Sequence, residues 1–149
     1  RWIYENTSAF PRASWCGLNM KLSTHLGIDV TLCGTIVFLD EGKATVKLTA
    51  TAEMAADSRG LVHGGFIFNA ADYAAMAAVN HPNVVLGAAE TKFLKATQVG
   101  ETVSLAASVV ESDGKRRRVE VPAVDRRRAG GGHRCRARVR AGIRMPCGR

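Results

Sequence analysis

The sequence predicts an α+β domain in which one antiparallel sheet wraps around a single long helix. Two observations support this class. Residues 28–50 and 84–121 contain segments in which apolar and polar side chains alternate, which is the period of a half-buried strand. Between them, residues 64–79 form an apolar, alanine-rich run that is too long for a strand and is filled with strong helix formers.

The first two strands are expected to form a hairpin, after an N-terminal segment (residues 1–26) that contains a short helix at residues 15–26. Ile28, Val30 and Leu32 share one face of the first strand, and Gly34 is a predicted bulge before its continuation at residues 36–39. Asp-Glu-Gly-Lys at residues 40–43 is typical of a turn, and residues 44–50 alternate in the second strand.

A loop at residues 53–61 is predicted to lead into the central helix at residues 64–79. The helix is apolar nearly all round, so we expect it to be buried on most sides. Pro82 ends it, because proline cannot continue a helix and disfavours helical geometry at His81. Three more strands are expected, at residues 84–94, 101–111 and 116–121, the last two joined by a Ser-Asp-Gly turn at residues 112–114.

The last 28 residues, 122–149, are not expected to belong to this domain, which would then cover residues 27–121. From Lys115 onward the chain holds 13 Lys and Arg against 2 Asp and Glu, whereas residues 1–114 hold 8 against 11. Pro122 would remove a hydrogen bond from an interior strand, and few apolar residues follow it. We expect this Arg-rich tail to be disordered or to come from a misassigned reading frame. It lacks aromatic residues and groove-reading motifs, which argues against specific nucleic-acid recognition.

The composition predicts a single globular domain, with 149 residues of which 46% are hydrophobic. No apolar run is long enough to cross a bilayer and no signal segment is visible, so we expect a cytoplasmic protein. Four cysteines occur singly and are expected to be free thiols: Cys16, Cys33, Cys135 and Cys147. Together with His133, two of them would make only a partial zinc site, and no metal is expected.

The chemistry of the sequence is concentrated at the start and the middle of the predicted helix. Asp72 is a single carboxylate in an apolar segment, where burial is costly unless the group is solvated, paired or used in a reaction. Gly64 and Gly65 open the helix, where backbone N–H groups lack partners and carry the positive end of the helix dipole. A ligand oxygen could approach closely there, and His63 could add a hydrogen bond or position the loop.

The spacing of these groups predicts a site shared between two chains. Asp72 lies 8 residues after Gly64, which places it about 12 Å along the same helix, too far to act on a carbonyl held at that helix's N-terminus. A second, antiparallel copy of the helix would supply the missing group, so a homodimer is the smallest complete unit.

The segments GLVHGGFIFNAADYA, LGIDV with DEGKATVKLTATAEM, and KFLKATQVGETVSLAASVVE resemble the hotdog fold, in particular the PaaI-like thioesterases of the phenylacetate pathway. The resemblance implies hydrolysis of acyl-CoA or acyl-carrier-protein thioesters without metal or cofactor. It implies that Gly65 polarises the thioester carbonyl and that Asp72 is the nucleophile or general base. His63 would support the loop. Asp57 stands where the family often has Asn, which changes the hydrogen bonds available for positioning water.

Further residues are candidates for substrate binding. Asn69 lies one turn before Asp72, and Thr91 is a candidate by its position on the strand. Arg59, Lys92 and Lys95 could hold CoA phosphates, although single basic residues are more often solvated surface charges.

Other interpretations of the same residues stay open. Asp72 could be a helix charge that reaches solvent, His63 a loop-capping residue, and the glycines a tight entry into the helix. At the level of function, the alternatives are a non-catalytic acyl-CoA-binding or sensing domain and, less favoured, a hydratase or dehydratase. The active unit is expected to be a homodimer or a dimer of dimers, and the sequence does not specify the acyl group.

Overall fold

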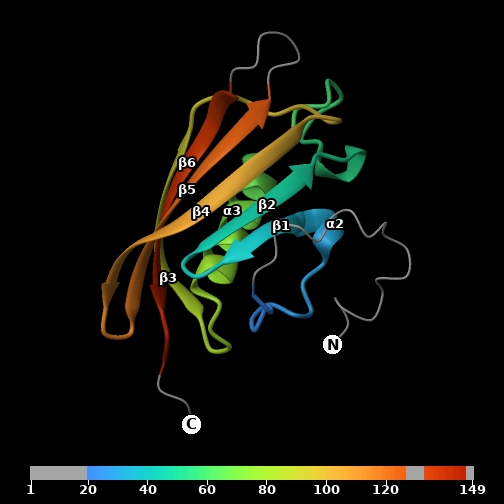
Figure 1. Ribbon diagram of the computed structural model, residues 1–149. Coiled ribbons are helices and arrows are strands. Elements are labelled where there is room, and N and C mark those ends of the chain that lie inside the picture. Colours follow the sequence, from blue (N-terminus) through green and yellow to red (C-terminus); the bar gives the residue numbers. More distant parts are fainter. Residues whose placement is uncertain (1–19, 127–132, 147–149) are drawn as a thin grey trace.

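The computed structural model describes residues 20–126 and 133–146 and confirms the α+β prediction. A six-stranded antiparallel sheet, in the order β1-β2-β4-β5-β6-β3, curves around the long helix α3 (Figure 1). The elements are α2 (Val30–Cys33), β1 (Thr35–Asp40), β2 (Lys43–Thr49), the 3-10 turn η3 (Ala52–Met54), α3 (Gly64–Val79), β3 (Val85–Phe93), β4 (Thr102–Asp113), β5 (Arg116–Arg126) and β6 (His133–Arg144).

Helix α3 is the centre of the core and has the predicted bounds. Its buried side chains are mostly alanines, which let the helix lie close to β2, β4 and β5. Asn80 ends the helix in the left-handed conformation, one residue before the break that Pro82 predicts. Within the described ranges 20–126 and 133–146, no helix is long and apolar enough to cross a membrane.

The strand predicted at residues 28–33 is wrong, because this segment contains the short helix α2. Asp29 caps the helix by accepting hydrogen bonds from the backbone N–H (2.8 Å) and hydroxyl (2.6 Å) of Thr31. Gly34 then turns the chain with φ +85°, and a Cβ there would lie 2.6 Å from the carbonyl oxygen of Lys47. Residues 20–26, within the predicted N-terminal helix, are also not helical, whereas its first part lies outside the described residues. The β1–β2 hairpin is confirmed.

The expectation that residues 122–149 lie outside the domain is wrong for most of that segment. Strand β5 runs on to Arg126, and β6 lies between β5 and β3. Four side chains of β6 face the core and are at most 2% exposed: Ala137, Val139, Ala141 and Ile143. The β4–β5 ladder has no pair between Leu105/Ala123 and Ser108/Glu120, where Pro122 lacks an N–H, whereas Pro122 is still paired with Arg138 of β6. A misassigned reading frame stays a hypothesis, which intact-mass analysis of the natively encoded protein would test.

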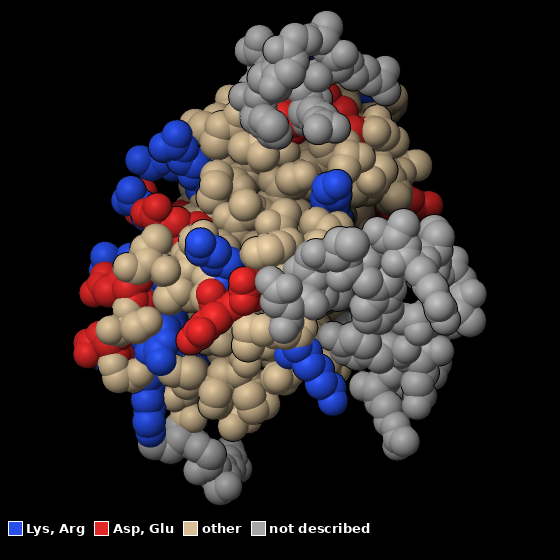
Figure 2. Space-filling view, in the orientation of Figure 1, with Lys and Arg blue, Asp and Glu red and all other residues tan. Residues whose placement is uncertain are grey.

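The outer face of the sheet carries the arginines that alternate with these core residues. Figure 2 shows basic and acidic side chains next to one another along this side of the molecule. Three ion pairs join them: Arg118–Glu111 (2.8 Å), Arg140–Glu120 (3.4 Å) and Lys92–Glu90 (3.8 Å). All are exposed, so each contributes little to stability, and the face serves mainly as the solvated side of the sheet.

Candidate active site

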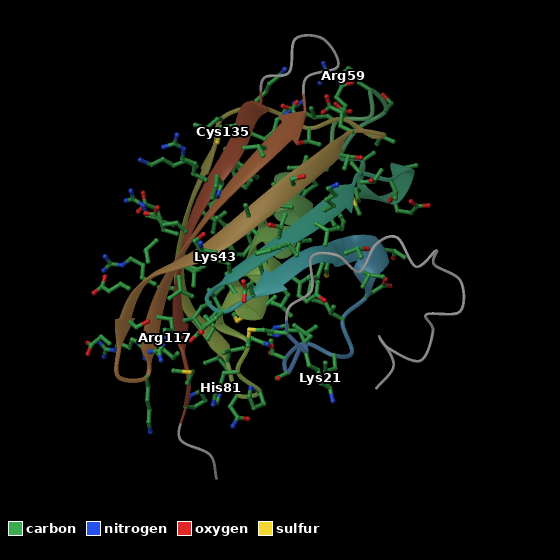
Figure 3. The ribbon with its side chains drawn as sticks, in the orientation of Figure 1. Lys21, Lys43, Arg59, His81, Arg117 and Cys135 are labelled. Carbon is green, nitrogen blue, oxygen red and sulfur yellow. The ribbon has the colours of Figure 1, made fainter. Side chains whose placement is uncertain are left out.

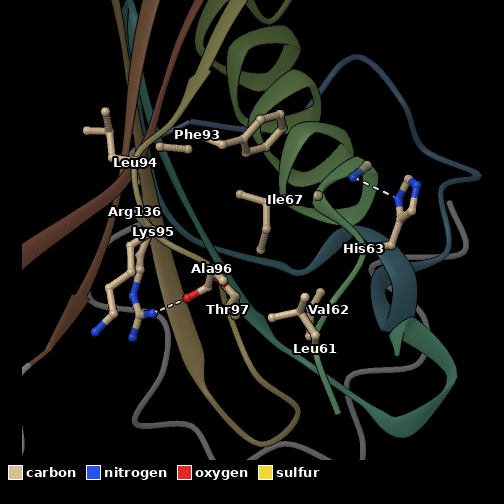
Figure 4. Close-up of a pocket in the computed structure, with 13 residues that line it drawn as sticks. Leu61, Val62, His63, Ile67, Phe93, Leu94, Lys95, Ala96, Thr97 and Arg136 are labelled. Atoms are coloured by element: carbon tan, nitrogen blue, oxygen red, sulfur yellow. Dashed lines mark hydrogen bonds between the residues drawn. The ribbon is translucent and has the colours of Figure 1, made fainter. Parts of the chain in front are cut away.

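An apolar cavity of about 540 Å³ lies at the N-terminus of α3, between the helix entry and the segment that follows β3 (Figure 4). Its apolar lining consists of Leu61, Val62, Ile67, Phe93, Leu94, Ala96 and Ala137. The polar residues at its wall include His63, Lys95, Thr97 and Arg136. A cavity of this size with few polar groups is typical of a small-molecule site.

The helix entry is held together by His63, which is the N-cap of α3. Its Nδ1 atom accepts a hydrogen bond from the backbone N–H of Gly65 at 2.9 Å, shown as a dashed line in Figure 4. The main-chain N–H of His63 is bonded to the carbonyl oxygen of Met54 at 3.0 Å. The Gly65 amide that we predicted to polarise a carbonyl is therefore bonded to His63 in the structure, and the ring must turn away before that amide can bind a substrate oxygen.

Both glycines at this entry have close neighbours that a side chain would press against. A Cβ on Gly64 would lie 3.2 Å from the ring of Phe93, and a Cβ on Gly65 would lie 2.7 Å from Nδ1 of His63. A Cβ on Gly64 would therefore be a tight contact, and a Cβ on Gly65 would force the imidazole of His63 to move. The paired glycines thus leave room for the Phe93 ring and the His63 imidazole at the helix entry.

A Gly65→Ala protein is expected to lose the His63 cap and to melt about 3 °C lower, because a lost N-cap costs about 1 kcal/mol. If the Gly65 amide binds substrate, kcat/KM also falls by more than about tenfold. Thermal melts and steady-state kinetics measure both effects. Gly27→Ala is the matched control, since a Cβ there has no neighbour within 4 Å. Equal stability of the two variants would contradict the capping role.

Arg136 is a site residue that the sequence analysis missed. Its side chain is only 4% exposed and pairs with Asp125 and with Glu101 (2.8 Å), and it also bonds the carbonyl oxygen of Ala96. Its own carbonyl accepts the N–H groups of Leu94 (2.8 Å) and Lys95 (3.1 Å). Arg136 therefore fixes the residues that form one wall of the cavity. The sequence signal was Asp125, one of two acids among the basic residues after Lys115.

Asp72 is a half-buried residue of α3 and does not line the cavity. Its Oδ1 atom is buried and has no hydrogen-bond partner. Burial raises the pKa of this carboxyl, and the positive charge of His25 partly opposes that rise. The helix start and Asp72 are thus separate places within one chain, as the spacing predicts.

Asn69, one turn before Asp72, is also away from the cavity. Its Nδ2 atom donates to Sγ of Cys33 at 3.0 Å, which joins α2 to α3. Burial is the main cause of the raised pKa of the Cys33 thiol, and the hydrogen bond from Asn69 lowers it. Substrate binding by Asn69 stays a prediction.

Asp57 organises the loop before the helix instead of facing the cavity. Its carboxylate accepts the backbone N–H groups of Arg59 (3.0 Å) and Leu61 (3.1 Å) and pairs with the guanidinium of Arg59 (2.9 Å). The hydrogen bond from Leu61, followed by that from Arg59, lowers the pKa of this carboxyl. The charge of Arg59 is therefore already paired, although its side chain is 84% exposed.

Replacing Asp57 by Asn should leave activity within about twofold, because the amide oxygen can still accept the two loop N–H groups. Asp57→Ala removes those bonds and is expected to lower the melting temperature by about 3 °C. Kinetics and thermal melts of both variants separate loop organisation from chemistry. A loss of more than about tenfold in Asp57→Asn would show instead that the charge takes part in the reaction.

The other substrate-binding candidates are divided by the fold. Thr91 and Phe93 lie on the same side of β3, since they are paired with the core residues Val139 and Ala137. Lys95 lines the cavity, whereas Lys92 is paired with Glu90. Among the candidates, Lys95 is therefore the basic residue best placed to meet a substrate.

Metal binding finds no support in the described part of the chain, where no three His, Cys, Asp or Glu side chains are grouped to hold an ion. Cys33 and Cys135 are free. Cys16, Cys147 and the side chain of His133 lie outside the described residues.

Comparison with known proteins relates this fold to thioesterases. A family model described as the thioesterase superfamily matches residues 59–129. An uncharacterized protein from Pyrococcus horikoshii superposes with a TM-score of 0.79 at 37% identity, over 87% of this chain and 95% of that chain. The E. coli PaaI protein from the phenylacetic acid degradation operon gives 0.65 at 27% identity, over 73% and 80%.

A curated relative carries a different name. The chain is 54% identical over 102 residues to a protein of Aquifex aeolicus named methylthioribose-1-phosphate isomerase. The match covers 68% of this chain but spans only about a fifth (22%) of the length of that protein.

Proposed function

Because this chain belongs to the hotdog-fold thioesterase superfamily, we propose that it hydrolyses the thioester bond of an acyl-CoA. The observation that carries the proposal is the pairing of two features on one helix. An apolar cavity meets the glycine-opened N-terminus of α3, and the same helix carries the half-buried Asp72 carboxylate, whose buried Oδ1 has no hydrogen-bond partner. The first can bind a carbonyl oxygen and the second can activate water.

The complete site is formed by two copies of the chain. Strand β3 is an edge of the sheet, and its end carries Phe93 (55% exposed) followed by Leu94 (56% exposed). Such an apolar edge requires a cover, and antiparallel pairing with β3 of a second copy provides one. That pairing turns the two α3 helices antiparallel, so that Asp72 of one protomer approaches the helix start of its partner.

The reaction then needs few groups. The Asp72 carboxylate takes a proton from water as the oxygen attacks the thioester carbonyl, and the developing oxyanion is stabilised by the N–H of Gly65 and the positive end of α3. His63 turns away to release that amide. When the C–S bond breaks, the protonated Asp72 returns its proton to the leaving thiolate.

The cavity favours an apolar acyl group. Its lining is mainly aliphatic and aromatic, and the guanidinium of Arg136 is already bound to two carboxylates, so Arg136 is not available to pair with a charged acyl end. Lys95 is the residue available for the phosphates of CoA or for the phosphopantetheine of an acyl carrier protein.

Release of free thiol from a panel of aliphatic, aromatic and dicarboxylic acyl-CoAs tests the proposal. We expect turnover of apolar acyl groups and little turnover of dicarboxylic ones. The occupied Gly65 amide favours one alternative, a non-catalytic acyl-CoA-binding domain. Tight binding of acyl-CoA by calorimetry without any turnover would reject the enzyme and support that alternative.

A further inference from the structure

A small hollow of about 140 Å³ lies where the ends of β3, β5 and β6 meet. Among the residues that line it are Gly87 of β3, Gly142 of β6, and three arginines: Arg116, Arg117 and Arg144. Pockets that hold a whole small molecule have volumes of roughly 300–1,000 Å³. The hollow is smaller, so it fits a single chemical group, and the arginines make that group an anion.

Two of these arginines face each other without a counter-charge. Arg116 and Arg144 are direct partners in the β5–β6 ladder, and both are exposed. Within the described part of the chain neither side chain forms an ion pair, although Asp113 lies opposite Arg116 on β4. Like charges directly opposite one another destabilise a sheet. A bound anion would remove this repulsion.

The next arginines along the same strands are different. Arg118 of β5 is paired with Glu111, and Arg140 of β6 is paired with Glu120. The outer face of the sheet therefore balances its charges at these positions and leaves them unbalanced at the hollow.

The backbone beside the hollow makes room for a guanidinium. The pairing of β3 with β6 shifts between Leu86 and Ala88, so Gly87 lies at an irregularity of the ladder. A Cβ on Gly87 would lie 3.1 Å from Nε of Arg144 and 3.3 Å from the carbonyl oxygen of Gly142. Glycine thus allows the Arg144 side chain to approach the strand closely. Irregularities of this kind are common next to functional sites.

The hollow is separate from the cavity at the start of α3. Gly87 comes six residues before Phe93 in β3, which is about 20 Å along the strand. Figure 3 shows Arg117 at the opposite end of the molecule from Arg59, which lies in the loop before α3. Within one chain the hollow is therefore a different place from the cavity that Lys95 lines.

We propose that this hollow binds a phosphate group through Arg116 and Arg144. The guanidinium is planar and donates parallel hydrogen bonds that match phosphate oxygens, and a dianionic phosphate offsets both charges. The group can come from two sources, free phosphate or CoA. The CoA source rests on the proposed function, since antiparallel pairing of two β3 strands brings the hollow of one protomer toward the cavity end of its partner's β3.

Titration with inorganic phosphate at constant ionic strength tests the site, with the arginine Nε–H signals followed by NMR. We expect saturable shifts of the Arg116 and Arg144 signals. Arg116→Gln and Arg144→Gln should each weaken binding at least about tenfold, because each removes charge-assisted hydrogen bonds. Gly87→Ala keeps every charge and should also weaken binding. Arg138→Gln is the matched control, since it removes an exposed charge from β6 outside the hollow and should change the affinity by less than about twofold.

Calorimetry with CoA and with dephospho-CoA, which lacks the 3′-phosphate, distinguishes the sources. Tighter binding of CoA that is lost in Arg144→Gln identifies the 3′-phosphate of CoA. Equal loss of both ligands in Arg144→Gln identifies the diphosphate, and saturation by inorganic phosphate alone identifies free phosphate. The proposal is overturned if neither phosphate nor CoA binding depends on Arg116 and Arg144, or if chloride gives the same response. None of these measurements needs turnover, so a lack of hydrolysis would reject the proposed function and leave this site decided.

Discussion

An Asp72→Asn protein is expected to lose thioester hydrolysis by a factor on the order of 10³, because a general base contributes about 10²–10⁴ to the rate. The variant should also melt at a higher temperature than the wild type. The carboxylate is half-buried with one oxygen unpartnered, so its ionised form is disfavoured in the folded state. An amide of the same shape avoids the burial of a charge.

The stability difference has a defined pH dependence. Burial raises the pKa of Asp72 in the folded state above its ordinary value of 3.8. Below that value both folded and unfolded carboxyls are protonated, and the variant and the wild type should melt alike. Below the raised folded pKa, the folded wild type keeps a proton on Asp72, and this protonation adds to its free energy of unfolding. As pH rises through that pKa the contribution is lost, so Asp72→Asn becomes the more stable protein.

Thiol-release kinetics and thermal melts between pH 3.5 and about pH 8 measure both effects. Glu41→Gln is the matched control, since Glu41 lies exposed in the β1–β2 turn and should change neither activity nor melting. An Asp72→Asn protein with unaltered turnover would remove Asp72 from the mechanism. Equal melting temperatures at neutral pH would show that the carboxylate is better solvated than the structure indicates.

Replacing Val139 by Asp is expected to unfold the domain. Val139 is 2% exposed in β6 and lies between Val121 of β5 and Thr91 of β3. Burying an unpaired charge there costs at least about 4 kcal/mol, most of the stability of a typical domain. Val139→Ala only opens a cavity and should lower the free energy of unfolding by about 2 kcal/mol, so this variant still folds and its unfolding can be measured.

The control for this experiment is the neighbouring residue. Arg138 is exposed on the outer face of the same strand, and Arg138→Asp should change the free energy of unfolding by no more than about 0.5 kcal/mol. Urea denaturation followed by circular dichroism measures all three variants. If Val139→Asp is as stable as Arg138→Asp, the C-terminal segment is not part of the core, and the sheet ends at β5.

The error at the C-terminus has a physical cause. Ala137, Val139, Ala141 and Ile143 alternate with polar residues as in any half-buried strand, but the partners of that strand are β5 and β3, whose own sequences lie before it. Arginines supply the outward positions, so the average composition is that of a disordered tail although the period is that of a strand. For this segment the alternation of apolar and polar residues predicts the strand correctly, whereas the high positive charge wrongly suggests disorder.

The wrong strand at residues 28–33 has a different cause. Ile28, Val30 and Leu32 alternate, yet Asp29 binds the N–H of Thr31 and starts a helical turn. A side chain that bonds its own backbone two residues later can outweigh a short apolar alternation. The alternation at residues 28–33 correctly indicates a partly apolar segment, but it wrongly predicts a strand where the chain forms a helical turn.

The sequence by itself determined the features that depend on neighbours along the chain: the bounds of α3, the turns of both hairpins, the His-Gly-Gly entry and the lone Asp72. Only the tertiary structure decided the place of β6, the burial of Arg136, and the bond between Gly65 and His63. The reason is that helical and strand periods are local properties of the chain. Strand order, burial and charge pairing depend instead on residues that are distant in sequence, and those are fixed only when the sheet closes around the helix.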